Sequence, residues 1–205
     1  MKPVLILYAT REGHTQRIAD RVAASARARG LSADVLNVAT IPPECTLDSY
    51  SAAIVAASVH RGHHETEMIR FVKSHASDLD RLPSAFLSIS LSEAGAEDPA
   101  ASPEKRKRAA ADVEAMIKAF VSETGWHPNK IQPVAGALMY SKYNWLLRFF
   151  MKRIARQAGA STDTSKDHEF TDWNALDHVI DELGLPITSD SVLAFARLPD
   201  GSSHV

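Results

Sequence analysis

Short apolar runs alternate with longer amphipathic stretches along most of the chain. Continuous or alternating apolar runs of strand length occur at residues 4–8, 33–38, 52–57, 85–90 and 131–139. Continuous runs are typical of strands buried on both faces, whereas alternation of the kind at 33–38 is typical of an edge strand. The pattern therefore predicts five strands, one of them at a sheet edge.

Helical stretches with one apolar face separate these runs, at residues 14–29, 65–78, 103–123 and 172–183. Gly30 ends the first stretch, and Ser102-Pro103 is a typical helix start. The segment 93–102 is acidic and rich in alanine and is predicted to be a loop. Strands alternating with helices predict an α/β fold with a parallel sheet covered on both faces. Ligands of such sheets bind beyond the carboxyl ends of the strands.

The composition of the chain argues against several classes of protein. The chain has 205 residues, a net charge of −2 and one cysteine, Cys45. The single cysteine excludes an internal disulfide, and the charge argues against a nucleic-acid partner. There is no signal-peptide pattern and no run of about 18 apolar residues, so we expect a cytoplasmic protein.

The loop after the first strand is the first candidate site, and it reads Thr10-Arg11-Glu12-Gly13-His14-Thr15-Gln16. A strand turning into a helix directs backbone N–H groups at one point, with the helix dipole behind them. This arrangement predicts a phosphate site to which Thr10 and Thr15 add hydroxyl groups. The patterns of P-loop and Rossmann nucleotide sites are absent. The residues alone also allow a simple turn at Gly13 with a helix cap at Thr15.

The pattern [ST]-x-x-G-x-[ST], formed by Thr10, Gly13 and Thr15, resembles the flavodoxin fingerprint. Further short segments resemble one branch of that superfamily, the menaquinone-dependent protoporphyrinogen oxidases. The resembling segments are residues 5–15, 57–64, 82–86, 134–138, 162–164 and 171–173.

The resemblance implies a flavodoxin-like, doubly wound five-stranded parallel sheet of order 2-1-3-4-5. It places an FMN-binding domain at 1–185, with an insert at about 141–169 and a C-terminal tail at 186–205. It also implies FMN-dependent oxidation of protoporphyrinogen IX to protoporphyrin IX, with electrons passing to menaquinone or ubiquinone. No side chain stands out as an obligatory acid or base.

The resemblance assigns two further loops to the flavin ring. The first reads Ser58-Val59-His60-Arg61-Gly62-His63, and the second reads Ser88-Ile89-Ser90-Leu91-Ser92-Glu93. The first loop is expected to hydrogen-bond the N5 side of the ring and the second its pyrimidine edge. The histidines lack a matching cysteine or carboxylate spacing, so we predict no metal and interpret them as solvated or anion-binding. Arg61 is the stronger candidate for holding a substrate carboxylate.

The segment 141–162 carries five basic residues and no acidic one. Its candidate residues for substrate or membrane contact are Tyr143, Trp145, Arg148, Lys152 and Arg153. Two interpretations stay open, a helix that meets an anionic membrane surface or substrate and a helix that packs on the sheet edge. The first predicts peripheral contact with the inner face of the cell membrane.

Two other functions share the FMN loops. A flavodoxin-type electron carrier fits poorly with a charge of −2 and a basic insert, because such carriers are usually strongly acidic. An FMN-dependent NAD(P)H quinone reductase needs a nicotinamide site, for which the sequence has no signature. The oligomeric state does not follow from the sequence.

Overall fold

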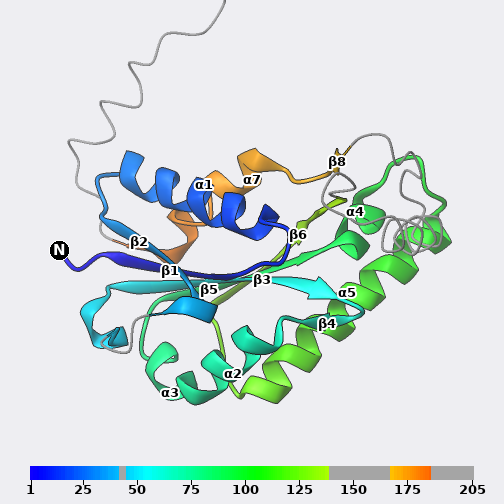
Figure 1. Cartoon of the computed structure of the whole chain (residues 1–205). Helices are drawn as coiled ribbons and strands as arrows, with labels where there is room; N and C mark the ends of the chain where they lie inside the picture. The colour runs from blue at the N-terminus through cyan, green and yellow to red at the C-terminus, as the bar shows by residue number, and fades with distance from the viewer. Residues whose placement is uncertain (42–44, 139–166, 186–205) are drawn as a thin grey trace, which may run out of the picture.

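A computed structural model describes residues 1–41, 45–138 and 167–185. Five parallel strands form the main sheet in the order β2-β1-β3-β5-β6, which is the predicted 2-1-3-4-5 order (Figure 1). These strands are β1 (Val4–Ala9), β2 (Ala33–Asn37), β3 (Ala52–His60), β5 (Ser84–Ser90) and β6 (Lys130–Ala135). The short strands are β4 (His63–His64), β7 (Ala137–Leu138) and β8 (His168–Glu169). The edge strand predicted at 33–38 is β2, and its register pairs Val4 with Ala33.

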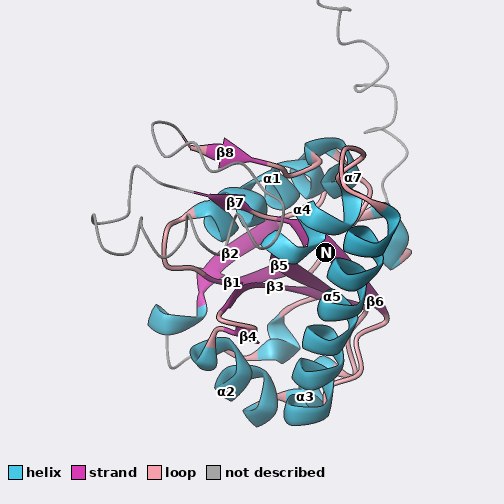
Figure 2. Ribbon diagram, turned by 90° about the vertical axis from the view of Figure 1, so that its right-hand side faces the viewer, coloured by secondary structure: helices cyan, strands magenta, loops and turns pink. Residues whose placement is uncertain are grey.

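Helices cover both faces of the sheet, as Figures 1 and 2 show. The helices are α1 (His14–Ala28), α2 (Thr66–Ser74), α3 (Ala76–Leu79), α4 (Leu91–Glu97), α5 (Pro103–Thr124) and α7 (Trp173–Asp177). Short 3₁₀ turns lie at Val38–Thr40, Leu47–Ser49 and Asp181–Leu183. Helices α1 and α7 lie on one face, and α2, α3 and α5 lie on the other. None of the described helices is long and apolar enough to cross a membrane.

The two cores follow from the alternation of side chains along the strands. Ile6 and Ile54 face α1 and pack against its Ile18. Leu5, Phe86 and their neighbours face the other layer, where the Phe86 and Phe120 rings stack with centroids 4.2 Å apart. Both faces of the central strands are buried, which is why these strands appear in the sequence as unbroken apolar runs.

Four predicted elements differ from the structure. The loop prediction for 93–102 is wrong at its start, because Leu91–Glu97 form α4 with Ser90 as its N-cap. The helix predicted at 65–78 is two helices, interrupted at His75, whose backbone N–H (3.1 Å) and ring Nδ1 (2.8 Å) both bond to the Phe71 carbonyl.

The predicted strand 131–139 and helix 172–183 are also shorter than expected. The strand ends at Ala135, and the chain then leaves the sheet to form β7, which pairs with β8. The last helix ends at Asp177, and only a 3₁₀ turn follows before Gly184 adopts a left-handed φ of 62°.

Candidate functional site

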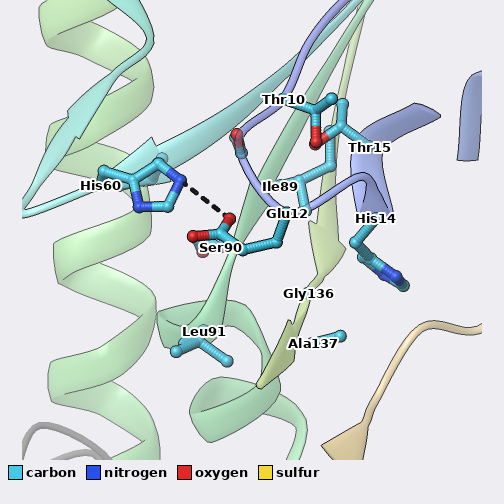
Figure 3. A pocket seen from close by; sticks show the side chains of 12 residues that line it. Thr10, Glu12, His14, Thr15, His60, Ile89, Ser90, Leu91, Gly136 and Ala137 are labelled. Atoms are coloured by element: carbon cyan, nitrogen blue, oxygen red, sulfur yellow. Dashed lines mark ion pairs between the residues drawn. The ribbon is translucent and has the colours of Figure 1, made fainter. Parts of the chain in front are cut away.

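A small open cleft lies at the carboxyl ends of the parallel strands (Figure 3). The lining residues come from four strand ends and are Thr10, Glu12, His14, Thr15, Ser58, Val59, His60, Ile89, Ser90, Leu91, Gly136 and Ala137. Three loops that are distant in sequence, and that the sequence assigned to one site, therefore meet at a single cleft.

The loop between β1 and α1 has the geometry of an anion site. Gly13 is the N-cap of α1 with a left-handed φ of 88°, and it offers no side-chain cap. Its own N–H donates to the Thr10 hydroxyl over 2.9 Å, which closes the turn. The first N–H groups of a helix have no intrahelical acceptor, and here no side chain caps them. Thr10 and Thr15 add hydroxyl groups at the same end of the cleft (Figure 3).

The remaining residues of this loop do not all reach the cleft. Gln16 is exposed on α1. Arg11 also lies outside the lining, because its Nε atom pairs with the Glu65 carboxylate at 3.0 Å. Glu12 does line the cleft, and its Oε2 lies 3.5 Å from Nε2 of His60 (Figure 3).

His14 is buried and is held by a residue far along the chain. The Thr171 hydroxyl donates its hydrogen to the Ala135 carbonyl over 2.6 Å, so His14 Nε2 must be the donor in its 2.8 Å bond to Thr171 Oγ1. The opposite ring nitrogen, Nδ1, lies 3.9 Å from Glu169 and has no hydrogen-bond partner among the described residues. Burial lowers the pKa of His14, and Glu169 offsets this in part. The ring is therefore neutral at pH 7.

The first ring loop is a hairpin rather than an open loop. Strand β3 continues to His60, and β4 returns antiparallel to it, so that His60 pairs with His63. Arg61 and Gly62 form the two-residue turn with φ values of 52° and 82°, the signs that a type I′ turn requires. Ser58, Val59 and His60 line the cleft, while the turn residues and His63 are exposed outside it.

Of these histidines, His63 is exposed, as the interpretation of them as solvated expects, and anion binding by them stays a prediction. His64 is buried in the core, and His60 Nε2 lies 3.1 Å from Oε1 of Glu65. The described residues contain no group of three potential ligands placed to hold a metal ion.

The second ring loop divides between the two faces of β5. Ile89, Ser90 and Leu91 line the cleft. Ser88 faces the opposite core and bonds to the buried His64 ring. Ser92 and Glu93 belong to the first turn of α4, where the Ser90 hydroxyl accepts the Glu93 N–H over 3.1 Å. Burial, followed by the charge of Glu97, raises the pKa of Glu93.

Two lining residues, Gly136 and Ala137, were absent from the sequence-based site. A Cβ on Gly136 would lie 3.4 Å from the Ile89 side chain and from the Ser90 carbonyl oxygen, so a larger residue would press on the cleft wall. The only sequence signal was the run of small residues after the fifth strand, Ala135-Gly136-Ala137. Tyr143, Trp145, Arg148, Lys152 and Arg153 lie outside the described residues.

These features fit FMN. The start of α1 offers backbone N–H groups and two threonine hydroxyls to a terminal phosphate. The ends of β3 and β5 supply two walls that contain both apolar and polar side chains, as a flat ring with polar edges requires. The site also lies at the topological switch point of the sheet, between β1 and β3.

Comparison with family models agrees with this architecture. A family model described as a flavodoxin domain matches residues 5–165. A flavodoxin of Streptococcus pneumoniae is 22% identical, with 63% of this chain and 83% of that chain covered and a TM-score of 0.42.

Two curated relatives are more similar in sequence, and both are named protoporphyrinogen IX dehydrogenase (quinone). That of Escherichia coli K12 is 37% identical over 82% of this chain and 87% of its own length. That of Leishmania major is 31% identical over 84% of this chain and 70% of its own. The chain belongs to the flavodoxin domain family and, within it, to the group of these quinone-dependent dehydrogenases.

Proposed function

We propose that this protein oxidises protoporphyrinogen IX to protoporphyrin IX with bound FMN and passes the electrons to a quinone. One observation carries the proposal: a cleft suited to FMN lies at the switch point of a chain 37% identical to a dehydrogenase of that name. The cofactor-binding residues proposed from the structure are those that line the cleft.

When bound, FMN supplies a two-electron acceptor that takes a hydride equivalent from one substrate and releases electrons to another. The chain supplies position and surroundings. Thr10, Thr15 and the first N–H groups of α1 would hold the phosphate. Val59, Ile89 and Leu91 limit the access of water along the walls.

The cleft also has a place for a proton. Its titratable side chains are Glu12, His14 and His60, and the Nε2 atom of His14 is bonded to Thr171. Glu12 Oε2 and His60 Nε2 are 3.5 Å apart, so a proton released on oxidation of the substrate can be held between these two atoms. Arg61 is exposed at the tip of the hairpin, beside the cleft rather than in it, and can contact a propionate of a substrate that extends beyond the flavin.

A quinone acceptor brings the protein to a membrane, and we include peripheral contact with an anionic membrane surface at the inner face of the cell membrane in the proposal. Among the described residues, Lys105, Arg106, Lys107 and Arg108 are exposed in the first turns of α5, with no ion pair to another described residue. Each basic residue near an anionic surface contributes about 1 kcal/mol of attraction. Sedimentation with phosphatidylglycerol vesicles but not with neutral vesicles is expected, and equal sedimentation with both contradicts this contact.

The catalytic proposal is tested with the purified, FMN-loaded protein. Protoporphyrinogen IX is added with a menaquinone or a ubiquinone analogue, and porphyrin fluorescence is followed without oxygen. Porphyrin formation that needs both protein and quinone supports the proposal, and the faster analogue identifies the acceptor. Reduction of the flavin by NAD(P)H instead would identify a quinone reductase. A protein that exchanges electrons only with other proteins would be a flavodoxin-type carrier.

A further inference from the structure

Glu65 is a buried carboxylate placed between the two polar loops of the cleft. Its side chain has no exposed surface, although it lies only one residue beyond the β3–β4 hairpin. Its backbone N–H donates to the Ser58 carbonyl over 3.2 Å, and its Oε1 accepts the Ser58 hydroxyl over 3.1 Å. Glu65 therefore closes the base of the hairpin that carries His60, through both its backbone and its side chain.

The same carboxylate reaches the phosphate loop. Arg11 Nε, on that loop, lies 3.0 Å from one Glu65 oxygen and 3.2 Å from the other. His60 Nε2 lies 3.1 Å from Oε1 of Glu65, and Glu12 approaches the same ring nitrogen at 3.5 Å. One side chain thus connects the loop expected to hold the phosphate with the wall expected to face the ring.

The carboxylate is ionised in this environment. Burial raises the pKa of Glu65, but the hydrogen bonds and charges of His60 and Arg11 outweigh burial, and the pKa is lowered overall. An isolated buried charge is costly, so the ionised form of Glu65 is stable only with these partners beside it. Arg11 does not depend on Glu65 in the same way, because 59% of its side chain is exposed to solvent.

We propose that Glu65 is a positioning residue of the flavin site, which holds the phosphate loop against the hairpin and, paired with Arg11, sets the charge beside the cleft. This proposal rests on the FMN-dependent function proposed above. It assigns to Glu65 and Arg11 opposite effects on the bound cofactor, although neither side chain lines the cleft.

The opposite effects follow from the charge that reduction adds. A negative group near a flavin disfavours the reduced cofactor, and a positive group favours it. A unit charge within about 10 Å of the flavin, at an effective dielectric constant of about 20, changes the equilibrium between oxidised and reduced flavin roughly tenfold. A tenfold change in the relative affinity for reduced and oxidised FMN is about 30 mV in the midpoint potential of a two-electron couple.

The test uses the full chain loaded with FMN and the variants Glu65→Gln, Arg11→Gln and the double variant. Glu65→Gln keeps the side-chain shape and is expected to raise the midpoint potential by about 30 mV. Arg11→Gln is expected to lower it by a smaller amount, because water screens the exposed guanidinium, and the double variant lies between the two single variants. Arg21→Gln is the matched control, because Arg21 is an exposed arginine of α1 paired with Asp177. Its potential is expected to stay unchanged.

The FMN dissociation constant, measured by quenching of flavin fluorescence, gives the second readout. Glu65→Gln is expected to weaken FMN binding several-fold because the two loops lose their common anchor. Single variants that leave the potential unchanged, or that move it in the same direction, overturn the assigned charge role and leave Glu65 as a packing residue. If Glu65→Gln fails to fold, Arg11→Gln alone decides, and an unchanged or raised potential overturns the proposal. A wild-type protein that binds no FMN overturns the proposed function as well.

Discussion

His64 makes the stability of this protein sensitive to acid. The residue follows the hairpin turn on β4 and is 4% exposed. Its ring lies 5.2 Å from the ring of Phe86 and 5.0 Å from that of Phe120, and its Nε2 is 2.9 Å from the Ser88 hydroxyl. A protonated imidazole in this apolar site would lose its hydration without a paired anion.

The size of the stability loss on acidification follows from the lowered pKa of His64. Burial lowers the pKa of His64 from 6.5 to about 4, against a smaller opposing effect of Glu65. Because the unfolded chain takes up the proton first, stability falls as the pH drops below about 6.5, and the loss is complete below about pH 4. The full difference is about 3 kcal/mol, of which about 2 kcal/mol is lost by about pH 5.

Urea unfolding at about pH 7.5 and about pH 5 measures this loss. His64→Gln removes the titration and keeps a hydrogen-bonding group for Ser88, so this variant is expected to lose about 2 kcal/mol less than wild type between the two pH values. His63→Gln is the matched control, because the neighbouring His63 is exposed and its variant is expected to behave as wild type does. If His64→Gln and wild type lose the same free energy on acidification, the reasoning about His64 is refuted.

Two further substitutions test the start of α1. Thr171→Val leaves the His14 Nε2–H and the Ala135 carbonyl without their partner, so the free energy of unfolding should fall by about 2–4 kcal/mol. Thr46→Val is the control, because Thr46 is exposed, and it should change the free energy of unfolding by less than about 0.5 kcal/mol. Equal losses in urea titrations would contradict this account. Gly13→Ala places a Cβ at a φ of 88°, which costs about 1–2 kcal/mol and should also weaken FMN binding. Unchanged FMN affinity, measured by fluorescence, would show that the loop is only a turn.

The strands and most of the helices could be predicted, because each central strand is an unbroken apolar run and each helix has one apolar face. The order of the strands was implied by the resemblance to flavodoxins and not by these patterns. The helix α4 was missed although its start has the sequence of a capping box, Ser90-Leu91-Ser92-Glu93. Its residues are rich in alanine but lack a buried apolar stripe, so hydrophobic periodicity gave no signal. Local capping chemistry and contact with α5 define this helix instead.

The candidate site was predicted where it depends on sequence position along the strands, and missed where it depends on tertiary contacts. Loops after neighbouring parallel strands must meet at one edge, so Thr10, Ser58 and Ser90 could be grouped from the sequence. The bond between Thr171 and His14 joins residues that are 157 positions apart in the sequence. The bond between Glu65 and Arg11 joins residues that are 54 positions apart. No local pattern specifies such pairs, because they arise only when the folded layers come together.

The claim that the cleft holds FMN with its phosphate at the start of α1 is tested most directly by comparing FMN with riboflavin. Riboflavin lacks the phosphate but has the same ring, so titration of the cofactor-free protein by flavin fluorescence isolates the phosphate contribution. Hydrogen bonds to a charged group are worth about 1.5–3 kcal/mol each, so FMN is expected to bind at least about tenfold more tightly. Equal affinities, or no binding of FMN, would contradict the account.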